Sequence, residues 1–214
     1  MRILSLTLLL GILLTIQACE SNPSASKTRP EDGPAHSREG DGRSPGRSSQ
    51  DDATASRAAF LAAYPVFMHP RCMNCHPDGD APLQGEDSHP HIMNVQRGPD
   101  GKGLYALRCS NCHQLTNLPG KGMPPGNPMW HLPPKALPMV FQGRTPAELA
   151  KQFKDPDQNG GRTLQQLLNH VSDDQLVIRS GWSPAEGCEK VPMPHKEFAA
   201  KMREWIEKGA AIPE

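Results

Sequence analysis

Large aromatic side chains are scarce in this sequence: tryptophan, tyrosine and phenylalanine together make up 5% of its 214 residues. Proline and glycine, by contrast, occur 23 and 19 times. This composition is too poor in large apolar side chains to fill an ordinary core for a chain of this length. We therefore expect part of the chain to be unstructured, and a bound apolar group to help hold the folded part together.

An excess of charge of one sign is also absent. The chain has 23 lysine and arginine residues and 23 aspartate and glutamate residues, so its formal net charge is zero. No basic surface indicates a nucleic-acid partner, and no acidic excess indicates a cationic one. We expect no nucleic-acid partner.

The longest apolar run, residues 3–16, is too short to span a membrane, and its position after Met1 and Arg2 is typical of a secretory signal. Residues 14–19 are similar to the lipobox of bacterial lipoproteins. We predict a signal peptide at 1–18, a lipidated Cys19, and a location on the periplasmic side of a bacterial membrane, with the lipid as the anchor. Plain signal cleavage, which would leave Cys19 as a thiol, is the alternative.

The next segment lacks large apolar residues, so it cannot bury enough surface to offset its chain entropy. This predicts a disordered linker at 19–53 and one folded domain at 54–214. Convincing runs of alternating strand residues are missing. Apolar spacing instead predicts helices at 51–64, ending before Pro65, and at 145–153, 163–171 and 195–208, with ordered loop at 118–138. The fold class is all-α and loop-rich.

Two segments, 72–76 and 109–113, have the pattern C-x-x-C-H, which is the attachment sequence of c-type haem. The motif cysteines are Cys72, Cys75, Cys109 and Cys112, and the motif histidines are His76 and His113. On one helical turn both thiols can reach the two vinyl groups of a haem while the imidazole binds the iron. The pattern predicts a c-type cytochrome built around two covalently bound haems, with each motif histidine as the proximal ligand.

A structural zinc site made of the four motif cysteines is the alternative from another class. It leaves unexplained why a histidine follows each pair, and the pairs lie further apart than in a usual zinc ribbon. Of the remaining cysteines, Cys19 belongs to the processing site, and we expect Cys188 to be buried or inert. A bridge between Cys19 and Cys188 is the alternative if Cys19 is not lipidated.

The ligand on the far side of each iron is less well defined by the sequence. For the first haem we favour His91, with His89 and Met93 as alternatives. For the second we favour Met123, because a Met-Pro pair in a glycine-rich loop looks like the distal loop of class I cytochromes c. His131 is the second choice and Met129 a further candidate, whereas we expect Met139 to be a packing residue of the core.

Several stretches resemble bacterial proteins labelled isoquinoline 1-oxidoreductase subunit, and the resemblance runs from about Ala58 to the C-terminus. The stretches are residues 71–76, 89–91, 94–103, 109–113, 130–134 and 141–144. The resemblance implies association with a periplasmic molybdenum hydroxylase. Too few cysteines are left for an iron–sulfur cluster once the haems are counted, so the chain would be the electron-accepting partner.

These observations lead to the hypothesis of a periplasmic electron-transfer protein with two haem c groups, a subunit of an oxidoreductase with no catalytic residues of its own. The alternative is a dihaem enzyme, such as a peroxidase, in which one iron has an open site for a small substrate.

Overall fold

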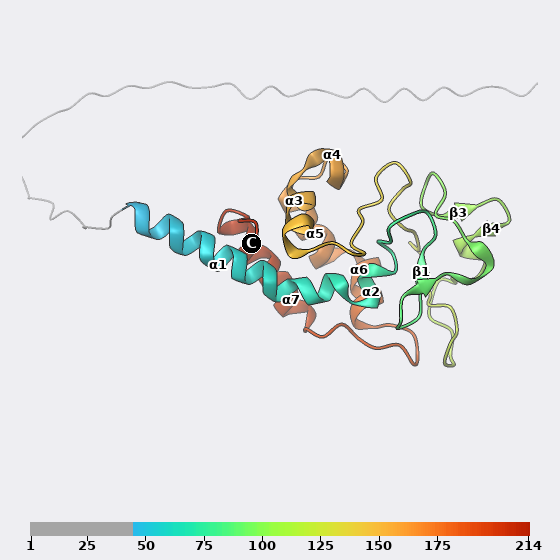
Figure 1. The fold of residues 1–214 in the computed structure, drawn as a ribbon. Helices are drawn as coiled ribbons and strands as arrows, with labels where there is room; N and C mark the ends of the chain where they lie inside the picture. Colours follow the sequence, from blue (N-terminus) through green and yellow to red (C-terminus); the bar gives the residue numbers. More distant parts are fainter. Residues whose placement is uncertain (1–44) are drawn as a thin grey trace, which may run out of the picture. The chain divides into compact units, whose positions relative to one another are not determined.

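The computed structural model describes residues 45–214 (Figure 1). Its α-helices are α1 (Pro45–Met68), α2 (Pro70–Met73), α3 (Pro146–Lys154), α4 (Pro156–Asn159), α5 (Leu164–Asp173), α6 (Gln175–Trp182) and α7 (His195–Glu207). Two antiparallel pairs of short strands are β1 (Leu83–Gln84) with β2 (His89–Pro90), and β3 (Gly103–Leu104) with β4 (Leu107–Arg108). Single 3-10 turns are η1 (Ile92–Asn94) and η2 (Cys109–Asn111). The prediction of a mainly helical, loop-rich chain is confirmed for this part.

The predicted signal peptide, Cys19 and residues 19–44 of the predicted linker lie outside the described residues. Helix α1 begins at Pro45, within the range that we assigned to the linker. Among the described residues, none of the helices combines the length and the apolar character that a bilayer-spanning helix requires.

Side-chain caps fix the beginnings of two predicted helices. Thr145 caps α3 and Thr163 caps α5, each in a reciprocal capping box with the residue three positions later. Helix α7 also occupies the predicted range to within one residue. Helices α4 and α6 were not predicted. They are only four and eight residues long, too short for apolar spacing to identify.

The prediction that the first helix ends before Pro65 is wrong, because α1 continues through Pro65 to Met68. A proline inside a helix costs about 3 kcal/mol. The residues that follow it, Val66 and Phe67, are almost completely buried in the core. Burial of their side chains, worth about 1.5–3 kcal/mol each, offsets that cost.

The few aromatic residues are concentrated in one core. All five phenylalanines of the chain, with Trp205, lie in a cluster formed by α1, α3, α5, α7 and the segment before α3. Phe67 is central: its ring centroid lies 5.1 Å from that of Phe153, 5.2 Å from that of Phe198 and 5.5 Å from that of Phe141. Figure 1 shows these helices gathered together, with α7 along α1 and the short strands beyond α2.

The segment 77–144 has little regular structure, and a buried arginine joins its parts. The guanidinium of Arg97 donates hydrogen bonds to the backbone carbonyls of Gly79 (2.7 Å), Pro133 (3.1 Å) and Pro138 (3.3 Å). Its backbone N–H donates to the Asp80 carbonyl at 2.7 Å. In a helix or a sheet, backbone N–H groups would donate to these carbonyls. Here the side chain of Arg97 donates to all three.

We expect Phe67→Ala to lower the free energy of unfolding by about 3–5 kcal/mol, because the change removes a ring that is 2% exposed and leaves a cavity. Leu61 lies on the same helix and is 47% exposed, so Leu61→Ala is the matched control and should cost less than about 1 kcal/mol. Urea denaturation followed by circular dichroism measures both. Equal losses would contradict the assigned core.

We expect Arg97→Met to lower the free energy of unfolding by at least about 2 kcal/mol, since three backbone carbonyls lose a charged donor whose side chain is fully buried. Arg203→Met, at an exposed position of α7, should have little effect. Limited proteolysis provides a second readout. Cleavage within 77–144 should accelerate in Arg97→Met but not in Arg203→Met.

Candidate functional site

Both C-x-x-C-H motifs form single helical turns, as the sequence predicts. In the first, the N–H of Cys75 donates to the Cys72 carbonyl at 3.2 Å, at the end of α2. In the second, the N–H groups of Cys112 and His113 donate to the Cys109 carbonyl at 3.1 and 2.9 Å, in η2. Each turn therefore presents two thiols and an imidazole close together.

The two motif histidines have closely similar surroundings. Nδ1 of His76 lies 2.7 Å from the carbonyl oxygen of Met139, and its ring stacks on Phe141 at 3.9 Å and 7°. Nδ1 of His113 lies 2.7 Å from the carbonyl oxygen of Pro125, and its ring stacks on Trp130 at 4.1 Å and 10°. A carbonyl acceptor at Nδ1 places the ring proton there and leaves the Nε2 lone pair free, which is how proteins orient a histidine that binds a metal.

Burial keeps both rings neutral. Desolvation lowers the pKa of His76 to about 3, and desolvation also lowers the pKa of His113. A neutral imidazole is the form that binds a metal, so both histidines are held in the required protonation state without a charged partner.

The thiols of the first motif are also desolvated. Burial raises the pKa of Cys72 to about 12 and that of Cys75 to about 11, so both are protonated near neutral pH. The motif cysteines form no disulfide with any described cysteine, and neither does Cys188. Among the described cysteines, all four motif thiols are therefore unpaired.

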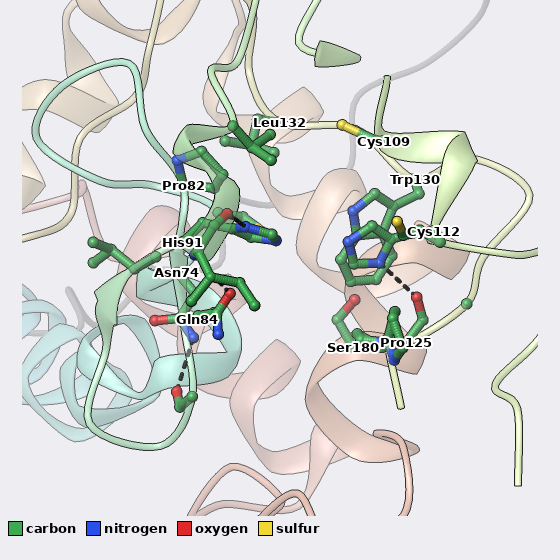
Figure 2. A pocket seen from close by; sticks show the side chains of 18 of the residues that line it. Asn74, Pro82, Gln84, His91, Cys109, Cys112, Pro125, Trp130, Leu132 and Ser180 are labelled. Carbon is green, nitrogen blue, oxygen red and sulfur yellow. Dashed lines mark hydrogen bonds between the residues drawn. The ribbon is translucent and has the colours of Figure 1, made fainter. Parts of the chain in front are cut away.

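A cavity of about 510 Å³ lies beside the second motif (Figure 2). Its walls include Cys109, Cys112 and His113 from the second motif, Cys75 from the first, and Cys188. Most of the other lining atoms are apolar. The volume is within the range of sites that bind cofactors.

Two polar atoms at this cavity have no partner within the described structure. They are Nε of Arg71 and Oδ1 of Asn74, both buried. Arg71 also forms an ion pair with Glu86 at 2.9 Å, and Arg179 lines the cavity as well. A buried guanidinium N–H without an acceptor is costly, so the site suits a group that brings carboxylate oxygens to its edge.

Apolar side chains that the structure leaves exposed gather at the same place. Ile92, Met93, Leu107 and Met123 are all exposed and all line the cavity. An exposed apolar surface around a concave site is typical of a binding site for an apolar group.

Some of the predicted distal ligands line this cavity and others do not. His91, Met93 and Met123 line it. His89, His131, Met129 and Met139 are not among the lining residues: His89 pairs with Asp87 at 2.6 Å, and Met139 is buried with its carbonyl held by His76. The ring centroid of His91 lies 6.4 Å from that of His113. His91, which we assigned to the first motif, therefore faces the histidine of the second.

The four motif thiols do not meet the geometry of a zinc site. Tetrahedral zinc needs four sulfur atoms close together. Within residues 45–214, one group of potential metal ligands has its ligand atoms within 4.8 Å of one another. This group consists of His69, Glu86 and Glu189 and contains no motif cysteine. Glu86 in that group is already paired with Arg71. The alternative of a zinc site built from the motif cysteines is not supported by this arrangement.

One histidine near the first motif was missed by the sequence reasoning. His170 on α5 lies 3.1 Å from Asp174 through Nδ1, and its charge adds to the burial that lowers the pKa of His76. Burial lowers the pKa of His170 itself, and the charge of His131 contributes to this shift. His170 therefore lies close enough to His76 and to His131 for their charges to interact. Apolar spacing predicts 163–171 only as a packing helix, so nothing in the sequence separated His170 from an ordinary surface histidine.

A close approach of two loops holds the acceptor of His113. A Cβ atom at Gly126, the residue after Pro125, would lie 2.0 Å from the carbonyl oxygen of Thr116. The N–H of Gly126 donates to Oδ1 of Asn117 at 2.8 Å. Only glycine allows the chain to pass at this distance, and this passage sets the position of the Pro125 carbonyl.

Comparisons of the chain with models of protein families, with curated proteins and with solved structures find no match.

We expect Gly126→Ala to lower the free energy of unfolding by about 1–3 kcal/mol, because the new methyl group collides with backbone that cannot move independently. It should also speed exchange of the His113 Nδ1 proton, observed by ¹⁵N nuclear magnetic resonance. Gly181→Ala is the control, since its nearest atoms lie at an ordinary 3.6 Å. A tolerated Gly126→Ala would show that the loops are not held at this distance.

Proposed function

We propose that the chain is a dihaem cytochrome c that carries electrons on the periplasmic side of a bacterial membrane. The observation that carries the proposal is the duplicated arrangement: two C-x-x-C-H turns, each with a neutral histidine that is hydrogen-bonded through Nδ1 to a carbonyl and stacked on an aromatic ring. A single turn of this kind is also compatible with a dithiol redox site. Two of them in one small domain, each followed by a histidine, favour two covalently held haems.

The thiols supply the covalent attachment. In each addition, the sulfur of a cysteine bonds to the inner carbon of a haem vinyl group, and the thiol proton ends on the outer carbon. Each addition is redox neutral and needs no oxidant. Cys72 and Cys75 would hold the first haem, and Cys109 and Cys112 the second.

His76 and His113 would bind iron through Nε2. When bound, haem iron supplies one-electron exchange between its ferric and ferrous states. The residues of this chain orient the imidazoles, exclude water and satisfy the carboxylates of the haem. Two guanidinium groups suit the last role. The Nε atoms of Arg71 and Arg97 are buried and have no partner among residues 45–214. Both positive charges also lower the pKa of the Cys75 thiol, so both groups lie near the first motif.

The two attachment sites are close enough to support transfer between them. Cys75 of the first motif lines the same cavity as Cys109 and Cys112 of the second, and a charge on Cys109 adds to the burial that raises the pKa of Cys75. Two haems attached at these positions would be neighbours. This arrangement favours an electron carrier over a catalyst that acts at one isolated iron.

The identity of the electron donor is proposed from the sequence resemblance alone. A molybdenum hydroxylase would pass electrons to this chain, which would relay them to a further acceptor. Lipidation at Cys19 would keep the domain near the membrane where such partners meet.

We expect the full chain, produced with a cytochrome c maturation system, to contain two haems per molecule by pyridine haemochrome assay and intact mass. The variants Cys72→Ala/Cys75→Ala and Cys109→Ala/Cys112→Ala should each contain one haem. Cys188→Ala is the control and should retain two, because Cys188 belongs to neither motif.

Two results would contradict the proposal. One is a wild-type protein without haem that binds zinc instead. The other is a loss of haem from Cys188→Ala equal to that from either double variant, which would show that attachment does not depend on the motifs.

A further inference from the structure

We propose that His91 and His113 are the two axial ligands of the second haem, so that this haem has bis-histidine ligation. The inference deepens the proposed function and rests on it. It also assigns His91 to the motif that follows it in the sequence, whereas our sequence analysis assigned it to the motif that precedes it and gave the second haem Met123.

The separation of the two rings is the first observation. Their centroids are 6.4 Å apart. Imidazole nitrogens bind metals at about 2 Å, and the nitrogen lies about 1 Å from the ring centre, so two imidazoles on opposite sides of one metal have centres about 6 Å apart. The rings are inclined by 57°, and rotation about a metal–nitrogen axis changes this angle without moving either nitrogen. The pair thus has the spacing that a shared metal requires.

Both rings line the same cavity. Figure 2 shows His91 directed across the cavity toward the wall that carries Trp130, Cys109 and Cys112. His113 stacks on Trp130 in that wall. The cavity therefore separates the two rings where the metal would lie, and the thiols that would attach the haem are on the His113 side.

The Nδ1 atom of His91 is hydrogen-bonded to a backbone carbonyl, as are those of His76 and His113. Its Nδ1 lies 2.7 Å from the carbonyl oxygen of Ile92, which leaves Nε2 free. Its N–H donates to the Pro82 carbonyl at 2.9 Å, and the N–H of Ile92 donates to Oε1 of Gln84 at 3.1 Å. These bonds tie the residue to strand β1, so the ring is positioned before any ligand binds.

The competing residues lack this positioning. Met93 and Met123 also line the cavity, but both side chains are exposed. His89, two residues before His91, is turned toward Asp87. His91 is the candidate whose ring stands at a ligand distance from His113.

Bis-histidine ligation has a consequence for the redox potential. A thioether ligand raises the reduction potential of a c-type haem relative to a second imidazole. The second haem should therefore have a lower potential than Met123 ligation would give. His91→Met should raise the midpoint potential of one of the two haems and leave the other unchanged in a spectroelectrochemical titration.

The test uses the ferric full-length protein and its haem spin state, read by electron paramagnetic resonance and near-infrared magnetic circular dichroism. We expect His91→Ala to convert one of the two haems from low spin to high spin, and added imidazole to restore low spin. Rescue by imidazole separates loss of a ligand from a general disturbance of the loop. Asp87→Ala, in the turn of the same hairpin, changes an exposed side chain that is not a candidate ligand. It is the matched control and should remain fully low-spin.

The double cysteine variants identify which haem changes. In Cys72→Ala/Cys75→Ala, which retains the second haem, His91→Ala should convert all of the remaining haem to high spin. In Cys109→Ala/Cys112→Ala, it should convert none. If the double variants do not fold, the imidazole rescue and the potential shift of His91→Met in the dihaem protein remain as the test.

The outcomes distinguish the two proposals. A wild-type protein that contains no haem overturns both. Two bound haems that stay low-spin in His91→Ala, with conversion to high spin in Met123→Ala, overturn the His91 assignment alone. Conversion of the first haem by His91→Ala overturns it as well and restores the pairing expected from sequence order.

Discussion

The buried guanidinium of Arg97 is the interaction on which the loop half of this protein depends. It joins the chain after the first motif, through Gly79, to the segment 133–138, and its own carbonyl accepts from Gly103, just before the second motif. Strands of two residues cannot hold so long a segment, because they satisfy too few backbone groups. A charged donor shared by several carbonyls performs this task, and its burial is tolerated because those carbonyls solvate it.

The two C-x-x-C-H motifs are supported in different ways as a result. The first lies at the end of α1 and α2, and its histidine stacks on Phe141, a member of the helical core. The second lies among loops, where His113 depends on the carbonyl of Pro125 and the ring of Trp130. The concentration of phenylalanines in the helical core leaves the second site with a cavity bordered by exposed apolar side chains. A haem would supply there the apolar surface that the sequence lacks.

Much of the helical half could be predicted from the sequence, because its signals are local. Thr145 and Thr163 cap helices within three residues, and the apolar stripe of α7 repeats along one helix. Prediction failed where packing outweighed a local preference. Pro65 should end a helix, but α1 continues to Met68 because the burial of Val66 and Phe67 offsets the cost of the proline. Short helices such as α6 contain too few turns for periodicity to be recognised.

The sequence by itself determined the helical turns of both motifs, the order of thiols and imidazole on each, and the capped helices, since each depends on residues within a few positions of one another. Tertiary structure alone decided which carbonyl and which ring support each histidine, and which motif His91 faces. Those partners are brought together by loop closure through Arg97 and by the close passage at Gly126, and neither leaves a periodic signal in the chain. His91 lies between the motifs in sequence, so only its position across the cavity from His113 connects it with the second.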